Sequence, residues 1–456
     1  MSTVKQRLNN VGIQLPDILL PKEEIDYKKW AVIACDQFTS EPDYWQKVGR
    51  YVGSDYSTLH LIYPEVYLNK PDMDERIENI NRNMDQYMKA GVFRDLPSSF
   101  VLVKRELPSG GMRTGLVLAL DLERYSYEKG AKTLIRATEG TILDRLPPRI
   151  RIRRNAPIEL PHIMVLIDDK EDLVFSKLRE REEDLPRLYD FELMEGGGRV
   201  EGFQVQDDAT LSGVAEAFEN LYSRAERTEA ETADSSEDGS PLLFAMGDGN
   251  HSFATAKAIW EETKKETGNM EHPARWAIVE LVNIYDPGLD FEPIHRLALG
   301  LDITVLKDFI DKFKAREHAG SRPTPRYEPA PDFPSALKRV SGGEEHRIAV
   351  ISKDECGVLV FPQPEVNLGV ASLDGFLEKL GDTVDFTVDY IHGAETTREL
   401  ASVTEIAEPR TGFILPDFSK DQLFPTVVGD GALPRKTFSM GEAREKRYYM
   451  EARRIQ

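Results

Sequence analysis

The most constraining feature of the sequence is an apolar run, a glycine turn and a helix pattern in direct succession. Residues 241–246 have the length and composition of a short buried strand, and residues 252–264 have the apolar spacing of a helix. Gly247 and Gly249, in the turn between them, permit positive φ and close approach of a ligand to the backbone. The first N–H groups of a helix lack internal partners, and the helix dipole favours an anion there. The sequence therefore predicts an α/β protein that holds a phosphate-sized anion at the start of this helix.

The polar residues of the turn leave two interpretations open. Asn250 and Ser252 are both good N-cap residues, so the pattern also fits a simple capped helix. Asp248 and His251 favour chemistry, because a carboxylate and an imidazole suit Mg²⁺ coordination, proton transfer or hydrogen bonding to a transferring phosphoryl group. The candidate phosphate-binding residues of the turn are Gly247, Gly249, Asn250 and Ser252, the candidate catalytic residues are Asp248 and His251, and the candidate metal ligand is Asp248.

Length and composition limit the number of domains and the cellular compartment that we expect. A chain of 456 residues is too long for a single hydrophobic core, which predicts two or three domains. We expect a main α/β domain over residues 1–300 and a smaller α+β domain over residues 301–456, because the composition changes near residues 300–302. No apolar run approaches the roughly 20 residues of a membrane span, and no secretory signal is visible at the N-terminus. We therefore expect a cytoplasmic protein that does not span a membrane.

Charge limits the choice of partners. The formal net charge of -21 disfavours nucleic acid, because proteins that bind a duplex usually present a basic face. Residues 135–155 reverse this sign locally, with six arginines, including Arg154, against two acidic residues. The arginines from 149 to 154 suit phosphate binding, and they equally suit a strand that presents alternate arginines to solvent. The sequence leaves the number of subunits open, with a homo-oligomer among the options.

Several segments along nearly the whole chain together resemble a bacterial and archaeal family, the domain of unknown function DUF1015. These segments are residues 35–39 (C-D-Q-F-T), 59–65 (L-H-L-I-Y-P-E), 138–141 (T-E-G-T), 248–252 (D-G-N-H-S), 286–296 (D-P-G-L-D-F-E-P-I-H-R) and 433–440 (L-P-R-K-T-F-S-M). The central turn resembles the D-G-H-H-R signature of ParB-like folds, a group that includes nucleotide hydrolases of chromosome partition, sulfiredoxin and kinases of free serine. The resemblance implies a ParB- or sulfiredoxin-like core with a large N-terminal elaboration, and nucleotide phosphates bound at the helix start.

The turn departs from that signature at two positions. Asn250 stands where a histidine is usual, and Ser252 stands where an arginine is usual. The lost guanidinium requires a substitute cation, and arginine is well suited because its fork can bind phosphate through two hydrogen bonds. The candidate substitutes are Arg154, His295 with Arg296, Arg435 and Lys436.

Two carboxylates are candidates for the base that takes a proton from a substrate hydroxyl. Asp36 follows an apolar run at residues 30–34 that reads as a strand, and a turn-forming or capping role suits it equally. Glu139 lies between two threonines and has basic neighbours. His162 follows a proline and reads as a satisfied loop histidine rather than a ligand.

The leading hypothesis is phosphoryl transfer from ATP or ADP, with Mg²⁺, to a small hydroxylated metabolite. Free serine is the first acceptor to test, and this choice comes from the resemblance alone. One alternative is a regulatory protein that binds a nucleotide in the same turn without catalysis. Another is a hydrolase of nucleotides or phosphate esters.

Overall fold

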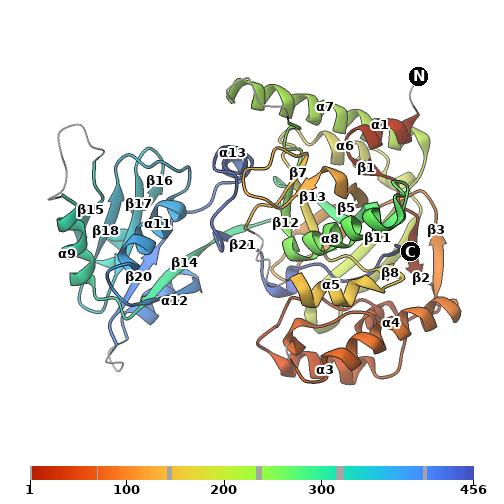
Figure 1. Ribbon diagram of the computed structural model, residues 1–456, viewed down its shortest axis with the longest axis horizontal. Coiled ribbons are helices and arrows are strands. Elements are labelled where there is room, and N and C mark those ends of the chain that lie inside the picture. The colour runs from red at the N-terminus through yellow and green to blue at the C-terminus, as the bar shows by residue number, and fades with distance from the viewer. Residues whose placement is uncertain (1–2, 69, 141–145, 233–238, 315–322, 404–407) are drawn as a thin grey trace. The chain divides into compact units, whose positions relative to one another are not determined.

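The computed structural model describes residues 3–68, 70–140, 146–232, 239–314, 323–403 and 408–456. It is a mixed α/β protein with two compact units, Met1–Leu289 with Glu442–Gln456, and Asp290–Gly441 (Figure 1). This division differs from the predicted boundary at residue 300 for two reasons. The strand β14 (Phe291–Leu299) pairs with strands of the second unit, and the end of the chain returns to the first unit, where β22 (Ala452–Arg454) pairs with β2 and β8.

The first unit is built on a large mixed sheet. Its described strands follow the order β10 (Arg187–Glu192), β11 (Arg199–Val205), β4 (Phe100–Glu106), β5 (Met112–Asp121), β13 (Trp276–Asn283), β9 (Met164–Ile167), β12 (Phe244–Asp248), β7 (Ile135–Arg136) and β6 (Tyr125–Ser126), with β1 (Ile13–Gln14) paired to β5. The strand β12 is antiparallel to β9 and parallel to β7. It therefore has a neighbour on each side, so its last residues leave the sheet from an interior position.

Successive residues of this sheet face two separate cores. On β5, Leu118 packs into one core and Val117 into the other, as the alternation of a strand requires. The first core is covered by α1 (Val4–Asn10), α6 (Leu173–Arg179), α7 (Asp208–Thr232) and α8 (Asn250–Thr267). The second is covered by α3 (Pro42–Val52), α4 (Met73–Lys89) and a small sheet of β3 (Phe93–Leu96), β2 (Ile18–Pro21), β22 and β8 (Ile158–Glu159). The unit thus has helices on one face of its sheet, and helices with a second sheet on the other.

Local structure confirms one sequence prediction and corrects two. The strand, turn and helix around residues 241–264 are confirmed as β12 and α8. The basic segment forms the helix α5 (Leu146–Arg154) and not a strand, and its two prolines occupy the first turn, where a missing N–H costs little. Residues 30–34 do not form a strand of a sheet, because the helix α2 (Tyr27–Trp30) ends there and Ile33 makes a single antiparallel bridge to Tyr448.

The second unit has its own mixture of strands and helices. Its strands are β15 (Arg326–Ala330), β18 (Cys356–Phe361), β17 (His346–Ile351), β20 (Arg410–Ile414), β14 and β19 (Thr387–His392) in sheet order, with β16 (Ser341–Gly342) on β17 and β21 (Phe438–Met440) on β14. Its helices are α9 (Ile303–Lys314), α10 (Phe333–Leu337), α11 (Gly369–Gly381), α12 (Ala394–Ala401) and α13 (Leu423–Gly429). No helix within the described residues of either unit is both long enough and apolar enough to cross a bilayer.

Candidate functional site

The helix α8 starts at the predicted glycine turn without a cap from the turn's own side chains. Gly249 is the N-cap residue, with φ 78° and ψ 26°, and a Cβ there would lie 3.1 Å from the Cα of Ile163. Both the left-handed conformation and the close contact therefore require glycine, whereas Gly247 lies inside β12. The capped-helix interpretation is not borne out: Asn250 is the first helical residue, its buried Oδ1 has no hydrogen-bond partner among the described residues, and the Ser252 hydroxyl bonds to His162.

Asp248, at the end of β12, is joined to the C-terminal segment. One carboxylate oxygen accepts a hydrogen bond from the Gly249 N–H at 2.9 Å, and the other lies 3.2 Å from the Nζ of Lys446. Burial by itself raises the pKa of Asp248, but Lys446 and His162 outweigh it and hold that pKa below its usual value. Asp248 is therefore an anion whose two oxygens already have partners.

The same contacts argue against a metal site built by the protein alone. Within the described parts of the chain, no group of three or more His, Cys, Asp or Glu side chains is placed to hold a metal ion. A cation beside Asp248 would also compete with the Lys446 ammonium. The residues present therefore do not fit a protein-held Mg²⁺ site at Asp248.

His162 connects the helix start to two distant parts of the sequence. Its side chain is 8% exposed, its Nε2 lies 3.1 Å from the Ser252 hydroxyl, and its Nδ1 lies 2.8 Å from the Tyr449 hydroxyl. The same Nε2 lies 3.7 Å from the Oδ2 of Asp36, and the Gln37 amide donates to the other oxygen of Asp36 at 3.0 Å. The predicted residues Asp36 and Ser252 thus meet at a histidine that the sequence had suggested was only a loop residue.

A pocket of about 130 Å³ lies beside the first turn of α8. Ser252, Thr255 and His162 line it, together with apolar side chains from residues 61–68 and 152–163. Glu65 and Arg149 also line it and form an ion pair with each other. Burial raises the pKa of Glu65, and the opposing influence of Arg149 does not cancel that rise. The pocket therefore combines an apolar wall with a paired anion and cation.

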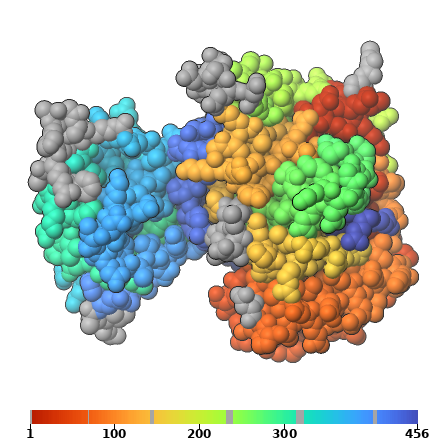
Figure 2. Space-filling model, in the orientation of Figure 1, coloured from red at the N-terminus to blue at the C-terminus, as the bar shows by residue number. Residues whose placement is uncertain are grey.

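The predicted cation Arg154 lies on the outer surface of the helix that supplies Arg149. It pairs with Glu262 of α8 at 2.8 Å, and its side chain is 52% exposed. The helices α5 (yellow) and α8 (green) adjoin each other on the face shown in Figure 2. Arg149 and Arg153 are the arginines of this helix that line the pocket, so a phosphate role for Arg154 would require the Glu262 pair to open.

Two other predicted residues lie close to the turn in sequence or structure. His251 is the second residue of α8, and its carbonyl accepts a hydrogen bond from the Thr255 hydroxyl at 2.7 Å. Glu139 follows Thr138, whose hydroxyl donates to the carbonyl of Met246 in β12 at 2.6 Å. Both are partly buried, and their chemical roles stay predictions.

The remaining predicted residues belong to the second unit. Arg296 is fully buried; it pairs with Asp374 at 3.0 Å and donates to the carbonyls of Lys436 at 2.9 Å and Arg435 at 3.1 Å. His295 accepts from the Leu415 N–H, and its pKa is lowered to about 4 by burial and by the charge of Arg296. Arg296 thus orders the exposed Arg435–Lys436 turn, while a phosphate-binding role for these four residues stays a prediction.

The C-terminal segment, residues 442–456, supplies the site residues that the sequence analysis missed. Lys446 reaches Asp248 and Tyr449 reaches His162, and the Ala34 N–H bonds to the carbonyl of Arg447 at 2.9 Å, next to the Asp36 loop. The available signal was the dense run of charged and aromatic residues over positions 444–454.

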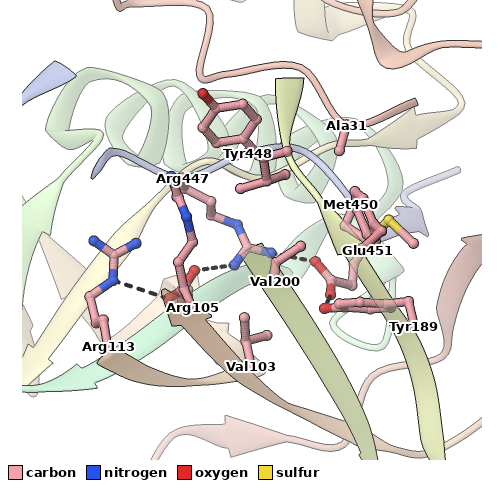
Figure 3. Close-up of a pocket in the computed structure, with 13 residues that line it drawn as sticks. Ala31, Val103, Arg105, Arg113, Tyr189, Val200, Arg447, Tyr448, Met450 and Glu451 are labelled. Atoms are coloured by element: carbon pink, nitrogen blue, oxygen red, sulfur yellow. Dashed lines mark hydrogen bonds and ion pairs between the residues drawn. The ribbon is translucent and has the colours of Figure 1, made fainter. Parts of the chain in front are cut away.

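A buried charge network anchors this segment to the large sheet (Figure 3). Arg447 pairs with Glu280 of β13 and, at 2.5 Å, with Glu451, which accepts from the Tyr189 hydroxyl at 2.5 Å. Burial raises the pKa of Glu280, but Arg447 and Arg113 more than offset this and lower it overall. Nearby, Arg105 donates to three backbone carbonyls, and burial, followed by the charge of Arg113, lowers its pKa to about 9.

Comparison with solved structures gives weak matches that span most of the chain. A free serine kinase in complex with AMP is 10% identical with a TM-score of 0.35, and the match covers 73% of this chain and 90% of that one. A conserved hypothetical protein from Pyrococcus furiosus is 10% identical with a TM-score of 0.34, covering 73% and 94%. SbnI with a C-terminal truncation, from Staphylococcus aureus, is 8% identical with a TM-score of 0.34, covering 71% and 82%. At these TM-scores the matches carry no inference about a ligand or reaction of this chain.

Comparison by sequence gives a clear family. No curated protein matches the chain. The family described as a protein of unknown function, DUF1015, matches residues 19–376, which include the glycine turn, His162 and every lining residue of the pocket except Tyr449. The chain therefore belongs to the DUF1015 family.

Proposed function

We propose that this protein transfers a phosphoryl group from a nucleotide to a small hydroxylated metabolite, with free serine as the first acceptor to test. The observation that carries the proposal is the start of α8. There a glycine N-cap leaves the helix uncapped by its own turn, and an ammonium group, a histidine and a pocket lie next to it. Such a helix end suits a phosphate, and the neighbouring pocket suits a second, uncharged or zwitterionic reactant.

The phosphate would bind at the first turn of α8. Backbone N–H groups at a helix N-terminus point toward an anion, and Lys446 adds a full positive charge that replaces the arginine absent at position 252. Asp248 holds that ammonium in place through the 3.2 Å contact. The Ser252 hydroxyl lies at the pocket wall, where it contacts His162 and has capacity for a further hydrogen bond.

The acceptor would occupy the pocket beside this turn. A volume of about 130 Å³ is close to that of cavities of ~150 Å³ that hold molecules of benzene size, which fits a small metabolite and not a complete nucleotide. The acceptor oxygen would attack phosphorus as the bond from phosphorus to the leaving nucleotide oxygen breaks, and a carboxylate would take the hydroxyl proton. Asp36 is the better placed candidate, because its Oδ2 lies 3.7 Å from the histidine that contacts Ser252.

Mg²⁺ would then enter with the nucleotide. This ion usually keeps several waters and binds through one or two carboxylates plus the phosphates of a substrate, so it does not require a protein-built cage. No step of the proposed reaction depends on a metal held by this chain.

The proposal is tested with the purified protein, Mg²⁺, ATP or ADP, and a panel of free amino acids and small alcohols. Mass spectrometry would read the phosphorylated acceptor, and calorimetry would read nucleotide binding. Phosphorylated product supports the transferase. Tight nucleotide binding without product would overturn it in favour of a regulatory protein, and phosphate release that no acceptor alters would overturn it in favour of a hydrolase.

Substitution of the two candidate bases should give unequal losses. We expect Asp36→Asn to lower the rate of transfer by ~100-fold or more, the scale of general-base catalysis, with little change in nucleotide affinity. Glu139→Gln is the matched comparison. Like Asp36→Asn, it replaces a predicted catalytic carboxylate by the amide of the same shape. Steady-state kinetics would measure both. A larger loss for Glu139→Gln than for Asp36→Asn would contradict the assignment of Asp36.

A further inference from the structure

The segment Leu59 to Glu65, singled out in the sequence but not used by the proposed reaction, forms the wall between two cavities. Leu61 and Glu65 line the pocket beside α8, whereas Leu59 and His60 line a second cavity of about 290 Å³. Residues 62–63 line both. The second cavity is near the lower end, ~300 Å³, of the usual size range of small-molecule sites.

Aromatic and cationic groups with flat faces surround the second cavity. Trp45 of α3 and Tyr63 are buried in its lining, and Tyr67 is partly exposed. The Arg76 guanidinium lies 4.3 Å from the centre of the Tyr67 ring, and Asp72 pairs with that arginine at 2.7 Å. Rings and stacked guanidinium groups bind planar aromatic ligands through their faces.

Two amides give this cavity a hydrogen-bonding edge. Asn79 and Asn83 lie one turn apart on α4, so they share a face of the helix, and both line the cavity. The Oδ1 of Asn79 accepts from Arg82 and the Nδ2 of Asn83 donates to the carbonyl of His60. No hydrogen bond within the described residues engages the Nδ2 of Asn79 or the Oδ1 of Asn83, which leaves one donor and one acceptor on the same face of α4.

We propose that the second cavity binds an adenine ring. The Tyr67 ring and the Arg76 guanidinium, which are its accessible flat groups, would stack on the base. The remaining amide donor and acceptor complement the ring-nitrogen acceptor and amino donor that adenine presents next to each other. A phenyl ring would leave the amide pair unmatched. The inference deepens the proposed function, because it places the base of the nucleotide in a cavity separate from the acceptor pocket, yet it concerns adenine binding only and can be tested without phosphate.

Gly49 offers a way to fill this cavity from a helix without disturbing the fold. It lies within α3 and lines the cavity, and a Cβ at this position would meet no atom within 4 Å. Gly49→Leu therefore adds a side chain into open space, and Gly49→Ala is the matched control, because it makes the same backbone change with almost no filling.

The experiment is calorimetry with adenosine, which carries the base and no phosphate, on the full chain and both variants. We expect Gly49→Leu to weaken adenosine binding at least tenfold and Gly49→Ala to leave it within threefold. Both variants should unfold at a temperature no lower than that of the wild type, because glycine is the weaker helix former. Asn79→Ala, on the partly exposed face of α4, should weaken adenosine more than it weakens phenylalanine. Equal adenosine affinity in wild type and Gly49→Leu, no adenosine binding at all, or equal binding of phenylalanine would each overturn the inference.

The result also separates the two proposals. Adenosine binding that is lost in Gly49→Leu, with no phosphorylated acceptor in any assay, would uphold the adenine cavity and reject the transferase. Transfer that continues in Gly49→Leu with an unchanged KM for the nucleotide would uphold the transferase and reject the adenine cavity.

Discussion

Replacing Arg447 with methionine should lower the free energy of unfolding of the first unit by about 3–5 kcal/mol, the typical cost of removing one partner from a buried ion pair. Arg447 is 3% exposed and bridges Glu280 and Glu451, which are 4% and 1% exposed. Methionine replaces the aliphatic stem but removes the positive charge between two buried carboxylates, so that Glu280 keeps Arg113 at 3.8 Å and Glu451 keeps the Tyr189 hydroxyl. Urea denaturation followed by tryptophan fluorescence would measure the loss, since Trp30, Trp45, Trp260 and Trp276 all belong to the first unit.

The matched control is the same substitution at Arg454, seven residues later in the C-terminal segment. Its pair with Asp95 joins side chains that are 46% and 63% exposed, and surface pairs contribute ~1 kcal/mol or less. A loss at Arg447 no greater than the loss at Arg454 would show that the buried network adds no net stability.

The pH dependence of this loss follows from the lowered pKa of Glu280. A carboxyl whose folded-state pKa lies below its unfolded value stabilises the fold above that unfolded value, and the contribution disappears as pH falls through the folded pKa. Without Arg447, Glu280 loses the largest influence that opposes its burial, so its pKa should rise. The difference between wild type and Arg447→Met should therefore be largest near neutral pH and shrink in acid, and a difference that grew in acid would contradict this assignment.

The parts of the site that the sequence predicted are local in the chain. A strand, two glycines and a helix follow each other within residues 241–267, so apolar spacing and turn chemistry are sufficient to place them. The need for glycine at position 249 is confirmed by its positive φ and by the closeness of Ile163. The alternative in which Asn250 or Ser252 caps the helix is not borne out, because the left-handed Gly249 is the N-cap residue.

The parts that the sequence did not predict are contacts between distant segments. His162 and Tyr449 are 287 positions apart, and nothing near either residue shows that a hydroxyl and an imidazole will meet. The two-unit division has the same origin: β22 pairs with β2 and β8, so the chain end folds with its beginning. Arg154 was selected for its charge, but the helical form of its segment directs Arg149 and Arg153 to the pocket and leaves Arg154 with Glu262 on the surface.

Replacing Asp248 with asparagine should abolish measurable phosphoryl transfer while the fold persists, with a loss of ~100-fold or more, as when one preorganised charge is removed from a reacting centre. Asparagine keeps an oxygen that can accept from the Gly249 N–H, which lies 2.9 Å from the present carboxylate. It removes the charge that holds the Lys446 ammonium at 3.2 Å. The freed ammonium should leave phosphate affinity unchanged or raise it, so the variant should bind nucleotide and fail to turn it over.

This split between binding and turnover distinguishes a catalytic role from a structural one, because a collapsed turn would lose both. Calorimetry with ATP and with ADP, and mass-spectrometric detection of the phosphorylated acceptor, would measure the two quantities on the same preparation. Glu262→Gln is the matched control. It also replaces a carboxylate by its amide, but Glu262 lies on α8 and pairs with Arg154 at the surface. If Asp248→Asn turns over as fast as Glu262→Gln, Asp248 has no role in the reaction. If Asp248→Asn loses nucleotide binding and turnover together, Asp248 only shapes the helix start.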